Sequence, residues 1–124
     1  MKKSTKLTFN ELMRRKEQVL QARKTKDTKD LYIASLDAVI TIEEPDGALC
    51  RDAIEMEQDD GNKYVCYECI KEPNLKSPEL QKAFECAAPM DIVEKIFKTG
   101  EIPQIAVECM KLAGYSGGVE EVKN

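Results

Sequence analysis

Apolar side chains recur every three to four positions near the start of the sequence, which is the spacing of one helix face. Thr8 and Glu11 have the spacing of a capping box, which satisfies the first N–H groups of a helix. We therefore expect one helix over residues 9–23. Its apolar stripe is narrow because charge occupies the other faces, so we expect only loose docking. The stripe consists of Phe9, Leu12, Met13, Val19 and Leu20.

The next part of the chain changes from a polar run to alternating β-branched residues. Residues 24–30 are polar throughout and predict a linker. Residues 31–33 and 39–42 then alternate in the manner of strands. They predict one short β-hairpin with its turn around residues 35–38. Because two strands alone are marginally stable in water, a helix is expected to cover one face.

The remaining sequence predicts short helices separated by proline and glycine. Residues 58–62 read as an acidic turn between two of them, and Gly100 as the end of another. The fold class we expect is α+β: a mostly helical small domain with one short β-hairpin and an N-terminal helical arm. The predicted helices cover residues 48–56, 64–70, 78–84, 92–97 and 102–113, and residues 115–118 are expected to form a flexible tail.

Charge divides the chain into two parts of opposite sign. Residues 1–29 hold ten basic and three acidic side chains, a balance of +7, whereas the remaining 95 residues hold nine basic and twenty acidic ones, or −11. A chain of 124 residues can bury one core. We therefore expect a basic amphipathic arm with its linker over residues 1–29 and a single α+β domain with a short flexible C-terminal tail over residues 30–124.

The residues that most enzymes need are missing. The chain has no histidine, which removes the commonest general base, the commonest metal ligand and every Ser-His or Cys-His nucleophile. No glycine-rich loop follows a predicted strand to hold a phosphate. The sequence therefore favours a binding protein, with no catalytic residue, metal or cofactor.

Cysteine spacing offers one weak alternative. Cys66 and Cys69 have the spacing of half a zinc site or of a redox pair, but no second half follows. On a helix the two thiols share a face with Ile70, so buried small apolar residues are the simpler interpretation. A zinc or redox protein remains the alternative.

Two further classes of partner, membranes and nucleic acids, can be judged from the pattern. No apolar stretch is long enough to span a membrane and no signal peptide is visible, so we expect a cytoplasmic protein. The basic arm is the only nucleic-acid signal, and Phe9 is the only aromatic residue in it that could stack on a base. A small nucleic-acid-binding regulator acting through the arm is therefore the second alternative. A solvated helix is the simplest reading of the arm.

Short segments along nearly the whole chain carry a family resemblance. These are LYIASL (31–36), ITI (40–42), EPD (44–46), VCYEC (65–69), EPNL (72–75), PELQKA (78–83), APMDIVEKIF (88–97), GEI (100–102) and KLAGY (111–115). Their order and spacing resemble the XkdN-like tail assembly chaperones of long-tailed phages and prophages of Gram-positive bacteria. Gly47, where a longer side chain is expected, and Cys86-Ala87, where glycine is commoner, depart slightly from the pattern.

The resemblance implies a partner and a place of action. Such a chaperone binds the tape measure protein, the long helical ruler of the tail, and covers its apolar faces. It is displaced as tail tube protein polymerises, so it acts in the cytoplasm of the bacterial host and is absent from the mature virion. Weak binding by each copy with avidity from many copies suits such release. The tail tube protein and a second copy of this chain are further candidate partners.

The resemblance assigns no contact residues, so two surfaces compete for the client. One is the arm with its stripe of Phe9, Leu12, Met13, Val19 and Leu20. The other is a groove between the last two helices near Tyr115. We favour the arm, because its stripe is the least needed by the core. The same stripe could equally join two copies of the chain.

Overall fold

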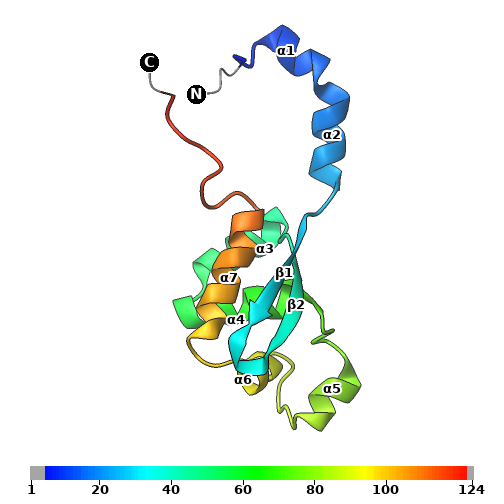
Figure 1. Ribbon diagram of the computed structural model, residues 1–124, viewed down its shortest axis with the longest axis vertical. Coiled ribbons are helices and arrows are strands. Elements are labelled where there is room, and N and C mark those ends of the chain that lie inside the picture. The colour runs from blue at the N-terminus through cyan, green and yellow to red at the C-terminus, as the bar shows by residue number, and fades with distance from the viewer. Residues whose placement is uncertain (1–4, 123–124) are drawn as a thin grey trace.

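The computed structural model describes residues 5–122 and has two parts, a helical arm and a body (Figure 1). The arm consists of α1 (Phe9–Arg14) and α2 (Lys16–Lys24), and none of its helical residues is buried. The arm projects from one end of the body, which contains a small sheet and the other helices. The polar face of the arm and its apolar stripe are therefore both open to solvent.

The arm begins as predicted but is not one continuous helix. Thr8 Oγ1 accepts a hydrogen bond from the Glu11 N–H at 3.2 Å, which caps α1. The Glu11 carboxylate pairs with Arg14 and Arg15 instead of returning to the Thr8 N–H. The prediction of one helix is wrong at Arg15, where the backbone bends with φ −91° and ψ 4°. No core packing holds the two helices in line, because neither has a buried face.

The predicted hairpin is confirmed, and the linker before it is shorter than expected. Strands β1 (Thr28–Ile33) and β2 (Ala38–Glu43) pair in antiparallel register. A 3₁₀ turn, η1 (Ala34–Leu36), connects them, and Asp37 follows it with a left-handed φ of 46°. Only residues 25–27 separate α2 from β1, because the polar residues Thr28 to Asp30 already belong to the strand.

A third strand and the start of the central helix were missed by the sequence pattern. Strand β3 (Ile70–Glu72) pairs antiparallel with β2, which gives the sheet order β1-β2-β3. Ile70 continues the helical spacing of the preceding residues, so it was assigned to their helix. Helix α4 (Gln58–Cys69) includes residues 58–62, which were predicted to form a turn. Their acidic side chains lie in its first turn, where they favour the positive end of the helix dipole.

The body is organised around α4, which packs against α3 (Gly47–Glu55), α6 (Asp91–Ile96) and α7 (Glu101–Leu112). Gly61 permits the close approach of α3, because a Cβ built there would lie 2.5 Å from the carbonyl oxygen of Ala53. Gly100, predicted to end a helix, instead precedes the first residue of α7, and α6 ends at Ile96. The remaining α-helix of the described residues is α5 (Pro78–Ala83).

One core lies between the sheet and the helices and confirms the predicted α+β class. It combines alternating residues of β1 and β2 with the inner faces of α4, α6 and α7. Helix α7 runs along the sheet beside β1 in Figure 1. Among residues 5–122, no helix has the length and apolar character that crossing a membrane requires. The most completely buried large side chains are Ile42, Leu75, Ile92 and Val93.

Candidate functional site

The arm presents the five apolar residues that the sequence singled out, and all five are exposed. Phe9 has 77% of its surface exposed, and Val19, the most covered of the five, has 36%. The bend at Arg15 separates the stripe into a part on α1 and a part on α2. The body covers neither part of the stripe, so all five apolar side chains are open to solvent.

Tyr115 lies elsewhere than predicted. It follows the C-terminal end of α7, whereas α6 lies near the other end of that helix (Figure 1). The expected groove between the last two helices near Tyr115 is therefore not formed. Tyr115 instead lines a cavity of about 300 Å³ with Arg23 and Lys26 from the root of the arm and Glu44 and Asp46 from the connection between β2 and α3.

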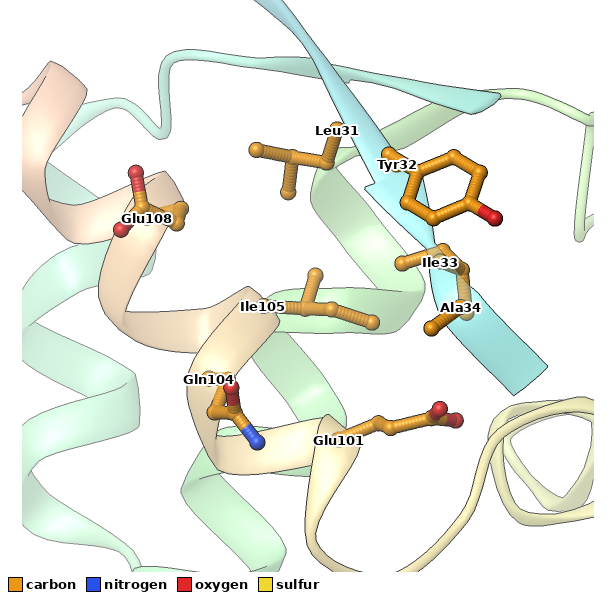
Figure 2. Close-up of a pocket in the computed structure, with 8 residues that line it drawn as sticks. All are labelled: Leu31, Tyr32, Ile33, Ala34, Glu101, Gln104, Ile105 and Glu108. Carbon is orange, nitrogen blue, oxygen red and sulfur yellow. The ribbon is translucent and has the colours of Figure 1, made fainter. Parts of the chain in front are cut away.

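A groove that the sequence did not predict runs between β1 and α7 (Figure 2). It has a volume of about 350 Å³. Figure 2 shows the Leu31 and Ile105 side chains pointing into the space between the strand and the helix, while the Tyr32 ring lies on the far side of the strand. The lining residues are Leu31, Tyr32, Ile33, Ala34, Glu101, Gln104, Ile105 and Glu108.

Two carboxylates flank the apolar floor of this groove, and both are held ionised. Hydrogen bonds from Lys29 and Lys111 lower the pKa of Glu108. Hydrogen bonds from the Lys98 backbone N–H and from Ser35 lower the pKa of Glu101. Lys29 Nζ lies 2.9 Å from Glu108 Oε1 and ties β1 to α7 at this end of the groove. The groove thus has an apolar floor and a polar rim, and both carboxylates of the rim already accept hydrogen bonds from other groups of the chain.

The outer edge of β1 adds backbone groups to this surface. The strand has β2 as its only partner in the sheet of the described chain. Because Asp27 O accepts a hydrogen bond from Glu44 N at 2.8 Å, positions 29, 31 and 33 also point their backbone groups toward β2. Those of Thr28, Asp30 and Tyr32 then point outward. This edge and the groove beside it could receive an extended segment of a partner.

All five cysteines are free thiols, and four of them are buried in the body. Cys50, Cys66, Cys69 and Cys109 are buried free thiols, and Cys86 is half-buried. Burial raises the pKa of Cys66 to about 12, so this thiol stays protonated at neutral pH. The hydrogen bond between Cys69 and Cys109 raises the pKa of Cys109. No group of three potential ligands in the described part of the chain could hold a metal ion.

The sequence contains the pattern of each element that lines the groove, but it does not show that the two elements lie side by side. Leu31 and Ile33 alternate on one face of a predicted strand, and Glu101, Gln104 and Glu108 recur at helical spacing. Nothing in the periodicity states that residues some 70 positions apart lie on facing elements. The arm could be predicted because its whole stripe is local in sequence.

A protein family model matches the chain over its whole length. The model of the family described as Phage XkdN-like tail assembly chaperone protein, TAC, matches residues 1–124. No curated protein and no solved structure gives a significant match. The family match covers the whole chain and confirms the resemblance predicted from the sequence.

Proposed function

Because the chain belongs to the Phage XkdN-like tail assembly chaperone family, we propose that it binds the tape measure protein and keeps it soluble until the tail tube forms. The observation that carries this proposal is the family match over all 124 residues. The proposed role is binding without catalysis. Its place is the cytoplasm of the bacterial host, and the protein does not remain in the mature virion.

The exposed arm supports this role physically. An amphipathic helix can lay its apolar face against an apolar face of a helical client, with anchors at helical spacing. Phe9, Leu12 and Met13 supply such anchors on α1. The basic side chains around them match acidic stretches of a client, which steers the encounter by charge. We therefore assign the first client contact to the arm.

The small size of the arm's apolar face suits a chaperone that must release its client. Burying a few side chains on each copy gives weak binding, because association first costs translational and rotational freedom. Many copies along one client then hold it by avidity. Tail tube subunits that polymerise on the client can displace the copies one at a time.

Co-expression with the tape measure protein tests the proposal. We expect the client to become soluble and to co-purify with this chain, and Leu12→Asp to reduce the recovered complex at least about tenfold by removing one apolar anchor. Val39→Asp is the matched control, because Val39 is an apolar residue of the body that is at least as exposed as Leu12. A client that stays insoluble and does not co-purify with the wild-type chain would contradict the proposal.

The nucleic-acid alternative predicts a different result in the same purification. A regulator acting through the arm should be retained on double-stranded DNA at low salt and released steeply as salt rises. We expect no such retention, because the chain has a net charge of −4 and its acidic body opposes binding to a polyanion.

A further inference from the structure

A second hollow lies on the body where the end of α3, the start of α4 and the side of α7 meet. Its volume is about 270 Å³, and its walls include Ile54, Met56, Val65 and Met110. Ile54 has 61% of its surface exposed and Met56 has 39%. Apolar side chains at the α3 end of this hollow are therefore open to solvent, whereas Val65 at its α4 wall is buried.

The rim of the hollow, residues 52–60, belongs to an acidic stretch of the chain, although none of the residues that line the hollow itself is charged. Acidic residues alternate with wall residues along residues 52–60, which hold five carboxylates and no basic side chain. None of the five forms an ion pair with another described residue. Lys63 follows close by, but its ammonium group pairs with Glu94 at 2.9 Å. An apolar segment with a basic flank would satisfy both the walls and the rim.

The arm has this combination of features. Its apolar stripe is uncovered, its charge balance is strongly positive, and in Figure 1 it extends away from the body that carries the hollow. We propose that the hollow binds the α1–α2 arm of a second copy of this chain. Phe9, Leu12 and Met13 supply the apolar contacts, and the arm's lysines and arginines face residues 52–60.

This interface is heterologous, because each copy gives an arm and receives another. It does not depend on the tape measure protein, but it uses the stripe proposed to bind that client. A second copy therefore covers the stripe until a client takes its place, and the two binding events exclude each other on any one arm.

Analytical ultracentrifugation of the full chain without client tests the inference through complementation. Leu12→Asp damages the arm and leaves the hollow intact, whereas Ile54→Arg damages the hollow and leaves the arm intact. Both positions are exposed, so the variants are expected to fold, and circular dichroism checks this. The wild type should exceed its monomer mass of 14.0 kDa as concentration rises. Each variant alone should stay monomeric.

An equimolar mixture of the two variants decides the matter. One intact arm and one intact hollow remain, so we expect a 1:1 dimer whose dissociation constant rises at least about tenfold between about 0.1 and 0.5 M NaCl. Val39→Arg should associate like the wild type. A mixture that stays monomeric overturns the inference. So does a wild type that sediments as a monomer at every concentration. Client capture by the monomeric wild type would leave the proposed function standing.

Discussion

Lys29 on β1 donates a hydrogen bond from Nζ to Oε1 of Glu108 on α7, across 2.9 Å and 79 positions of sequence. Both side chains are partly exposed, so the ion pair contributes less than about 1 kcal/mol. We expect Lys29→Met to lower the free energy of unfolding in urea by about 0.5 kcal/mol at low salt. Lys95→Met is the control, because Lys95 on α6 forms no ion pair with another described residue. Equal effects of the two substitutions would show that the pair contributes nothing.

The pH dependence of stability should report the same carboxylate. Lys29 first and Lys111 second lower the folded-state pKa of Glu108 below the ordinary value of 4.5. The resulting stabilisation is fully present above the unfolded pKa and is lost as the pH falls through the folded pKa. The stability difference between the wild type and Glu108→Gln should therefore shrink from about pH 6 to about pH 3. Urea midpoints at each pH measure it, and a constant difference would contradict the assignment.

Gly61 should be the least replaceable glycine of the body. A methyl group there would meet the backbone oxygen of Ala53 at 2.5 Å, so α3 and α4 would have to separate. We expect Gly61→Ala to cost about 1–3 kcal/mol in urea unfolding, even though alanine favours helix by about 1 kcal/mol. Gly100→Ala is the control, because nothing lies within 4 Å of the added methyl group. Similar stabilities for both variants would argue against this close contact.

The rate of thiol labelling distinguishes buried structural cysteines from cysteines that form a metal or redox site. Only the half-buried Cys86 should react rapidly with a thiol reagent in the native protein, and all five cysteines should react in denaturant. Cys86→Ser should abolish the fast phase. Fast reaction of Cys66 or Cys69, or release of bound zinc on labelling, would favour the metal or redox alternative.

Filling the groove between β1 and α7 tests whether the client also uses it. Gln104 is exposed and lines the groove, so Gln104→Trp should occupy it without disturbing the core. If a client segment binds there, recovery of the co-purified complex should fall several-fold. Val107→Trp, on the same helix but outside the groove lining, should leave recovery unchanged. Unchanged recovery with Gln104→Trp would restrict client binding to the arm.

Local signals explain which parts of the fold could be predicted. The hairpin and α7 follow from patterns contained within a dozen residues. The helix predicted over residues 78–84 is α5, and the Ser77 hydroxyl caps it by accepting a hydrogen bond from Leu80 N. The bend at Arg15 could not be predicted, because it results from the absence of packing on the arm. Strand β3 was missed because pairing with β2, a tertiary contact, overrides the helical spacing of Ile70.

The candidate binding surfaces also differ in whether local sequence or tertiary packing determines them. The arm stripe was readable because amphipathic spacing is local and its exposure follows from a narrow apolar face. Tyr115 was misplaced because its position depends on the direction of α7 relative to α6. The two hollows of the body join residues from separate elements, and the periodicity of each element alone does not specify its neighbours.

The arm's length sets how much client one copy can protect. Residues 9–24 at about 1.5 Å per residue reach at most about 24 Å along a helical partner, and the bend at Arg15 shortens this span. The linker of residues 25–27 adds only about 10 Å of reach. Under the proposed function, the number of copies required grows in proportion to the client's length. A phage with a longer tail would then need a proportionally larger supply of this protein during each assembly cycle.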